Sequence, residues 1–435
     1  MTTAPHEVII LNDYASVTGG STAVAVASAL ELAARDVRVT LFTCVGPVAA
    51  ELQDVPNLEV ICLGQAEIAK NRNRFQAFAQ GWRNRAAVDA LRTLLRGKPR
   101  DRTVVHAHTW TKALSPFALE AVTRLGFKLV VTLHDFFIAC PNGGFFVHGE
   151  NELCRRVPLS AACWACNCDR RNYAHKLWRG ARTVIQNRIL RIPAKVSGFI
   201  GVSEFSLRLL RPDLPATTPA RVIRNPVDVP ASAADGRVRA EENREFLFVG
   251  RFEVEKGVRL FAEAVQTSGL KATFVGDGAE LAAVRRMCPG ATFTGWLPPA
   301  EIRRRLRRAR ALVFPPLWYE TLGLVVIEAA AAGVPAIVSD QCAATDHVVD
   351  CVTGLHFAHG SAGALAGKMW QLADNDGLTA RLSQLAHEWY WREPWTRARH
   401  VGELLGFYAE IAGGVEPSVA KGGIYESAGR DRAGR

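Results

Sequence analysis

The sequence predicts an α/β fold built from two doubly wound domains. At 435 residues the chain is too long for one typical hydrophobic core. Short apolar runs alternate with helix-forming segments in both halves, a pattern typical of parallel sheets covered by helices. Between the halves, residues 229–244 are rich first in Pro, Ala, Ser and Gly and then in charge, which predicts a linker.

Composition favours a soluble, cytosolic protein with anionic partners. Hydrophobic residues make up 49% of the chain and charged residues 22%, as is ordinary for a globular protein. There is no apolar run long enough to span a membrane, and the first residues lack the pattern of a signal peptide. The net charge of +11 favours nucleic acid, phosphorylated ligands or an acidic membrane face.

The first predicted unit is strand, turn, helix, strand. Residues 6–11 and 37–42 are apolar and strand-like, and residues 22–34 between them favour a helix. The connecting turn carries Gly19 and Gly20 and suits a phosphate at the helix start. It matches neither the dinucleotide fingerprint nor the P-loop, and a simple tight turn is the alternative explanation of the glycines.

Two further predicted strands end in histidines. Residues 103–108 end in His108, and residues 128–135 end in His134. Ligands of open parallel sheets bind beyond the carboxyl ends of the strands, so His134 is a candidate site residue. A purely structural histidine is the alternative.

A cysteine-rich insertion is expected at residues 140–168. Cys163 and Cys166 form a C-x2-C pair that suits tetrahedral zinc, and Cys140 and Cys154 are available as the other two ligands. Free thiols and a disulfide remain alternatives, although the expected cytosolic setting argues against a disulfide framework.

The second half opens with a strand that leads into a cationic loop. Residues 245–249 are strand-like, and Arg251 and Lys256 follow before a predicted helix at 258–265. The planar guanidinium of arginine and the compact ammonium of lysine can both neutralise the charge of a phosphate. A surface pair of cations is the alternative.

The most informative stretch lies at residues 311–333. A strand at 311–314 is followed by a loop with Glu320 and by a helix at 324–332 that carries Glu328. The helix start offers free N–H groups to an anion, and Gly323 allows a ligand close to the backbone. Glu328 stands among aliphatic residues, where an unpaired carboxylate is costly. The alternative is a helix with two solvated glutamates.

The segment from Glu320 to Glu328 resembles the E-x7-E signature of retaining GT-B glycosyltransferases of the family-4 (glycosyl transferases group 1) type. The resemblance covers roughly residues 6 to 412. Further segments similar to that family's motifs lie at residues 103–108, 132–135, 225–228, 250–257, 328–340 and 351–357.

The resemblance implies a GT-B fold of two Rossmann-like domains with an interdomain cleft. The division it implies is an acceptor-side domain at 1–228 with the cysteine-rich insertion, a linker at 229–244, a nucleotide-sugar domain at 245–390, a helix at 391–412 that crosses back to the first domain, and a disordered tail at 413–435.

The resemblance also assigns residues to the donor nucleotide. Arg251 and Lys256 would bind the diphosphate, Glu328 the ribose, and the turn at Gly20 would face the phosphates and the acceptor. Eight helical residues rise about 12 Å, which is the reach from the sugar to the ribose of a nucleotide-sugar.

For the transferred sugar, the resemblance implies His134 and Glu320 as catalytic residues. The backbone around Gly323, with Leu322 and Leu324 on either side, would help to orient the sugar. No metal or other cofactor is expected in catalysis, so zinc would be structural only.

The implied activity is transfer of a hexose from a UDP- or GDP-sugar to a glycan or lipid-linked acceptor at the cytosolic membrane face, with no nucleic-acid partner. The alternative is an inactive metal-binding scaffold on the same fold, and the intact site residues argue against it. A GT-B phosphorylase is excluded because no matching lysine segment lies near the C-terminus.

Basic residues cluster in two further stretches. Residues 70–96 combine arginines with Phe75, Phe78 and Trp82, and this pairing of charge with apolar rings favours contact with anionic lipid. Residues 301–310 carry six arginines, which we expect on the solvated face of one surface helix.

Overall fold

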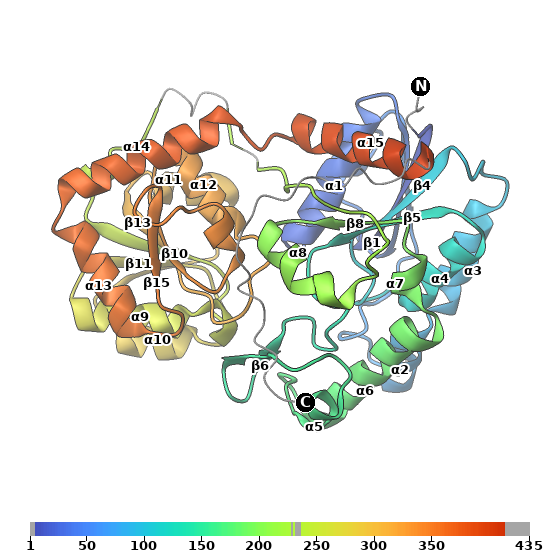
Figure 1. Ribbon diagram of the computed structural model, residues 1–435, viewed down its shortest axis with the longest axis horizontal. Coiled ribbons are helices and arrows are strands. Elements are labelled where there is room, and N and C mark those ends of the chain that lie inside the picture. Colours follow the sequence, from blue (N-terminus) through green and yellow to red (C-terminus); the bar gives the residue numbers. More distant parts are fainter. Residues whose placement is uncertain (1–4, 228, 231–235, 414–435) are drawn as a thin grey trace.

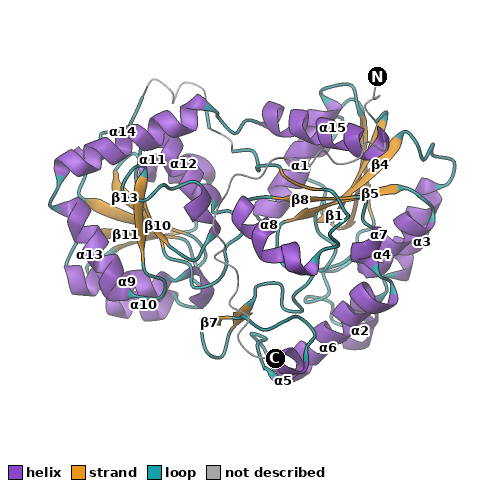
Figure 2. Ribbon diagram, viewed as in Figure 1, coloured by secondary structure: helices purple, strands orange, loops and turns teal. Residues whose placement is uncertain are grey.

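The computed structural model describes residues 5–227, 229–230 and 236–413. They form two α/β domains, each with a central parallel sheet between layers of helices (Figures 1 and 2). The predicted fold class of two doubly wound domains is therefore confirmed.

The sheet of the first domain consists of parallel strands in the order β3-β2-β1-β4-β5-β8-β9. Their bounds are β1 Glu7–Tyr14, β2 Arg38–Val45, β3 Leu58–Cys62, β4 Thr103–Ala107, β5 Lys128–Leu133, β8 Gly198–Gly201 and β9 Ala220–Val222. The chain runs outward from β1 to β3 and then returns to β4 on the other side of β1. The switch point between β1 and β4 is where such sheets leave a crevice for ligands.

The strands are continuously apolar because both faces of the sheet are covered. In β1, Ile9 and Leu11 pack into one core and Val8 and Ile10 into the core on the opposite face. The helices of this domain are α1 Gly20–Ala33, α2 Arg74–Trp82, α3 Arg85–Leu95, α4 Pro116–Arg124, α5 Ala161–Ala165, α6 Tyr173–Val184, α7 Ile192–Lys195 and α8 Glu204–Leu210.

The sheet of the second domain repeats this plan with the order β12-β11-β10-β13-β14-β15. The strands are β10 Glu245–Val249, β11 Ala272–Val275, β12 Thr292–Gly295, β13 Ala309–Phe314, β14 Ala336–Ser339 and β15 Gly354–Phe357. The helices are α9 Val258–Ser268, α10 Leu281–Met287, α11 Pro299–Leu306, α12 Leu324–Ala332, α13 Ala362–Ala373, α14 Asp376–Arg392 and α15 Arg397–Gly413. Here the switch point lies between β10 and β13.

The last helix, α15, lies on the first domain beside α1 (Figure 1). Its Leu404 and Phe407 share a core with Ile10 of β1, and Tyr408 Oη is 2.6 Å from His106 Nδ1. The chain thus returns to its starting domain, as the resemblance implies.

The second part of the expected linker packs on the second domain. Val238 N–H donates to the Ala332 carbonyl over 2.9 Å, and Ala240 is buried. Residues 228 and 231–235 of the linker region lie outside the described residues, as does the expected disordered tail apart from Gly413.

The expectation of one exposed basic helix at residues 301–310 is wrong for Arg310. Helix α11 ends at Leu306, and Arg310 lies in β13 with a fully buried side chain. Its guanidinium donates to the carbonyls of Leu372, Glu241 and Asn243 and to Asp376. The strand needed a buried donor there because three carbonyls from other elements converge on it.

Replacing Arg310 with Met should lower the free energy of unfolding by about 3 kcal/mol, since buried carbonyls lose their donor. Urea denaturation of this variant measures the loss. Arg308→Met is the matched control, because Arg308 is exposed and its loss should cost under about 0.5 kcal/mol. Equal stability of the two variants would contradict the structural role of Arg310.

Candidate active site

The two switch points meet across the interface between the domains. Thr321, in the loop after β13, donates from Oγ1 to the His134 carbonyl at the end of β5 over 3.1 Å. Ser203 Oγ donates to the Thr321 carbonyl over 2.7 Å. A Cβ atom at Gly20 would lie 3.6 Å from Leu324 Cδ1. The structure therefore brings the predicted glycine turn and His134 of the first domain to the start of α12.

Lys256 and Glu320 form an ion pair of 2.5 Å at the centre of this region. Their side chains are 20% and 14% exposed, so the charges are only partly screened by water. Trp318 Nε1 donates to the same Glu320 oxygen over 3.1 Å, and Lys256 Nζ lies 4.9 Å from the centre of the Trp318 ring. Two residues predicted for phosphate and sugar thus contact each other directly.

The glycine after Lys256 makes this approach possible. Gly257 has a left-handed backbone with φ of 70°, and a Cβ atom there would lie 1.7 Å from the Pro315 carbonyl oxygen. The cationic loop therefore packs directly on the start of the Glu320 loop. Arg251 lies exposed at the end of β10, five residues before Lys256 in the same loop.

Helix α12 begins and ends where the sequence predicts. Gly323 and Gly333, the residues that flank it, are both left-handed, with φ of 85° and 79°. Leu322 is buried at 3% exposure, and Gly323 would carry a Cβ only 2.9 Å from the Phe314 ring. Glu320 precedes Leu324, the first residue of the helix, by only four positions, so the helix start follows the Lys256–Glu320 pair closely in the chain.

Glu328 lies half-buried on α12, next to Tyr390 of α14. Burial raises the pKa of Tyr390 to about 12, and the nearby Glu328 carboxylate adds to the shift. The carboxylate remains partly accessible, as a residue that binds hydroxyls must be.

Neutral histidines line the first-domain side. His134 Nε2 and His108 Nδ1 are 2.9 Å apart, and His106 Nε2 is 2.7 Å from Thr132 Oγ1. Burial lowers the pKa of His134 to about 3 and that of His108 well below its ordinary value. These rings are therefore uncharged at neutral pH and act as hydrogen-bonding groups.

Sequence reasoning missed several residues that hold the site together. Trp318 could have been suspected as an aromatic residue beside Glu320. Thr321 and Ser203 join the domains, and Asp346 accepts from Phe205 N–H over 2.6 Å. These contacts depend on how the domains meet and leave no signal in the local sequence.

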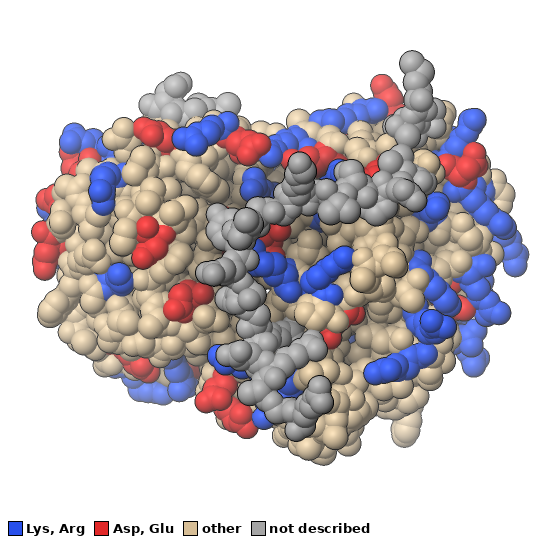
Figure 3. All heavy atoms as spheres, viewed as in Figure 1, with Lys and Arg blue, Asp and Glu red and all other residues tan. Residues whose placement is uncertain are grey.

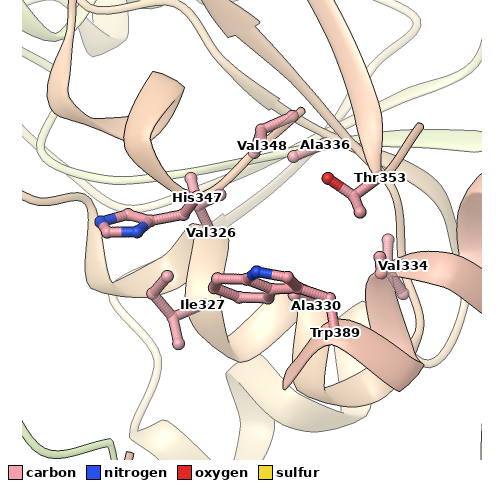
Figure 4. A pocket seen from close by; sticks show the side chains of 10 residues that line it. Val326, Ile327, Ala330, Val334, Ala336, His347, Val348, Thr353 and Trp389 are labelled. Atoms are coloured by element: carbon pink, nitrogen blue, oxygen red, sulfur yellow. The ribbon is translucent and has the colours of Figure 1, made fainter. Parts of the chain in front are cut away.

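A small cavity lies behind α12, between Val326 and Ile327 of the helix and Trp389 of α14 (Figure 4). Its volume is about 10 Å³, room for one water molecule at most. His347 faces it with a pKa lowered by burial to about 3. This cavity reflects the packing behind the helix and is too small for a ligand site.

The four predicted zinc ligands lie in the same part of the first domain, but the structure does not arrange them as a metal site. Within the described residues, no three His, Cys, Asp or Glu side chains lie close enough together to hold a metal ion. Cys140 Sγ donates to Asn142 Oδ1 over 3.0 Å, and Lys176 Nζ donates to Cys163 Sγ over 3.2 Å. Cys154 is buried and Cys166 partly exposed. Zinc binding would need the sulfur atoms to converge, and it stays a prediction.

Both halves of the chain match known glycosyltransferase families. Residues 18–230 match Glycosyltransferase Family 4, and residues 234–389 match Glycosyl transferases group 1.

Curated relatives share part of their length with the chain. A glycogen synthase of Mycobacterium tuberculosis is 30% identical over 185 residues, which are 40% of this chain and 44% of the relative. A GDP-mannose-dependent alpha-mannosyltransferase of Mycolicibacterium smegmatis is 33% identical over 38% of this chain and 43% of its own. The chain thus spans less than half the length of these relatives.

Solved structures match over nearly the whole chain. Sucrose-phosphate synthase of Thermosynechococcus elongatus superposes with a TM-score of 0.67 at 17% identity, over 94% of this chain and 100% of its own. HepE of Anabaena, in complex with UDP, gives a TM-score of 0.62 at 16% identity, over 93% and 100%. These similarities establish the GT-B fold.

Freshly purified, reduced protein should contain about one zinc ion per chain, as expected for a tetrahedral thiolate site. A Cys163→Ser/Cys166→Ser variant should lose it, whereas Cys351→Ser, an exposed cysteine of the second domain, should keep it. Elemental analysis of the three proteins measures the metal. Absence of zinc from the unaltered protein would leave free thiols as the state of the insertion.

Proposed function

Since the chain belongs to the GT-B glycosyltransferases whose two halves the Family 4 and group 1 families describe, we propose that it transfers a hexosyl group from a nucleoside-diphosphate sugar to a glycan or lipid-linked acceptor, with retention of the anomeric configuration. One observation carries the proposal: the Lys256–Glu320 pair stands at the switch point beside the start of α12 and opposite His134.

The donor nucleotide is a UDP- or GDP-sugar. The UDP in the HepE complex and the GDP-mannose in the name of the mycobacterial relative support these two nucleotides. Arg251, Lys256 and the first turn of α12 bind the diphosphate through charge and N–H groups. Glu328 binds the ribose hydroxyls.

Donor binding changes the partner of Lys256. Its ammonium is balanced by the Glu320 carboxylate, so an entering diphosphate competes for the lysine. Once Lys256 turns to the phosphate, Glu320 is released to accept hydrogen bonds from sugar hydroxyls, and Trp318 Nε1 continues to orient it. The pair therefore keeps two charged side chains in place until the substrate arrives.

In the reaction, the bond between the anomeric carbon and the diphosphate oxygen breaks, and its electrons go to the diphosphate. Arg251, Lys256 and the start of α12 stabilise that developing charge. The acceptor hydroxyl forms the new bond to the anomeric carbon, and its proton goes to the oxygen of the departing diphosphate. His134, being neutral at physiological pH, orients a sugar hydroxyl as a hydrogen-bonding group.

The enzyme works on the inner face of the membrane, held there by α2 and α3. The part of the chain that the structure describes has no helix long and apolar enough to cross a membrane. Phe75 is 90% and Phe78 49% exposed, which large apolar rings at a surface seldom are without a partner. Trp82 is partly buried, against Phe78 at 4.9 Å between ring centres. Basic side chains gather around the outer edge of the first domain, at the right of Figure 3.

Replacing Arg251 or Lys256 with Ala should weaken the binding of UDP or GDP by about 1.5–3 kcal/mol, because each loses a charge-assisted contact to phosphate. Isothermal calorimetry with both nucleotides measures this and names the preferred one. Lys271→Ala, an exposed lysine of the same domain, is the control and should bind as the unaltered protein does. If both site variants keep full affinity, the proposed donor site is wrong.

Replacing Arg72, Arg83 and Arg85 with Glu should release the protein from anionic vesicles, because each cation near such a surface contributes about 1 kcal/mol. Flotation with anionic and neutral vesicles at low and high salt measures the binding, which salt should weaken. Arg304→Glu/Arg307→Glu/Arg308→Glu makes the same change of charge on α11 and in the residues just after it, in the second domain, and should still float. Should the unaltered protein ignore anionic vesicles at low salt, a dissolved acceptor would replace the membrane in the proposal.

A further inference from the structure

A large hollow lies between the cysteine-rich insertion and the second domain. Its volume is about 1220 Å³. The hairpin of the insertion, β6 Phe146–Val147 and β7 Glu152–Leu153, lies between the two domains (Figures 1 and 2), and Glu152 and Leu153 line the hollow. Residues from the insertion form one wall, and the start of α9 with the loops after β13 and β15 forms the other. Hollows at domain interfaces are preferred ligand sites.

The hollow shares a wall with the candidate donor site. Leu317 and Val254 line it. Leu317 is the chain neighbour of Trp318, and Val254 lies two residues before Lys256. The two loops are joined by a hydrogen bond of 2.9 Å from Leu317 N–H to the Glu255 carbonyl. A Cβ atom at Gly144 would lie 3.2 Å from the Trp318 ring. A molecule in the hollow can thus reach toward the transferred sugar from the insertion side.

Basic side chains from both domains face this space. Arg155 and Arg156 come from the insertion, and Arg259 and His359 from the second domain. Glu152 and Glu263 are the acidic residues of the lining. Burial lowers the pKa of His359, and the Arg155 cation lowers it further, although Asp340 acts in the opposite sense. Arg155 and His359 are therefore close enough across the domains to repel each other when both are charged.

The three arginines of the hollow differ in whether they have a bonded partner in the protein. Arg259 pairs with Glu280, and Arg156 bonds to Cys154. No ion pair of Arg155 is found within the described residues, and its side chain is exposed. A carboxylate or phosphate beside Arg155 would supply an anion for its guanidinium, and the neutral His359 ring can hydrogen-bond the same group.

The insertion is fixed in position against the second domain. Arg170, at its end, forms an ion pair with Glu253, and its second nitrogen lies 3.9 Å from Glu255. Buried Lys176 of α6, which follows the insertion, donates to Cys163 Sγ within it. The wall that carries Arg155 is thus held in place before any ligand arrives, which lowers the entropy cost of binding.

We propose that this hollow binds the acceptor saccharide, and that Arg155, together with Arg156 and His359, selects acceptors that carry an anionic group, either a carboxylate or a phosphate. The inference rests on the proposed function, because it gives the acceptor its chemical class. Neighbouring Asn151 and Ser160 provide polar groups for the sugar hydroxyls.

The test compares defined probes on protein whose donor site is saturated with UDP or GDP. Trigalacturonate supplies carboxylates, farnesyl diphosphate supplies phosphate, and maltotriose is the neutral sugar. The probe whose anion is recognised should bind at least about tenfold more tightly than maltotriose, as expected for a charge-assisted hydrogen bond.

An Arg155→Ala/Arg156→Ala variant should lose that preference by about tenfold and keep its affinity for the nucleotide, which also shows that it folds. Arg171→Ala/Arg188→Ala removes two exposed arginines away from the hollow and should bind like the unaltered protein. Calorimetry measures all affinities. Tighter binding of trigalacturonate names a carboxylate, and tighter binding of farnesyl diphosphate names a phosphate.

Equal binding of anionic and neutral probes, or an unchanged preference in the Arg155→Ala/Arg156→Ala variant, would overturn the inference. Failure of the unaltered protein to bind UDP and GDP is a separate outcome, and it would overturn the proposed function instead.

Discussion

The ion pair of Lys256 and Glu320 joins the two loops that leave the second sheet at its switch point. It forms because Gly257 lets the cationic loop lie directly against Pro315, where any side chain would collide with the backbone. The Trp318 side chain contacts both members of the pair, and its ring also packs against Gly144 of the first domain. The proposed donor site, the shape of the hollow and the contact between the domains all depend on this close contact of the two loops.

The site is complete only where both domains meet. The second domain supplies the cations and the helix start, whereas the first supplies neutral rings whose burial holds their pKa values low. Thr321 spans the interface by bonding the carbonyl of His134. Such a division suits a charged leaving group on one side and uncharged sugar hydroxyls on the other, because each part of the donor meets groups of matching polarity.

Much of this arrangement could be predicted from the sequence where local rules decide the structure. Helix α12 was placed at its observed bounds because a glycine at each end adopts the left-handed conformation. Ser203, a residue type that commonly caps a helix, is the N-cap of α8 and accepts from Ser206 N–H over 3.0 Å. Arg310 was misassigned because a helical spacing of arginines continued past the real end of α11. The bonds of Asp346 and Thr321 escaped prediction because they join elements far apart in the chain.

The cysteine-rich insertion shows how one segment can serve both domains. It belongs to the first domain by sequence, yet Arg170 anchors it to Glu253 of the second. Lys176 of the following helix α6 is buried and bonds the Cys163 thiol of the insertion, because a buried ammonium without a partner is costly to desolvate. These bonds hold the insertion as a fixed wall beside the Lys256 loop. A wall fixed in this way can discriminate between acceptors by charge, whereas a mobile loop would let its arginines follow any ligand.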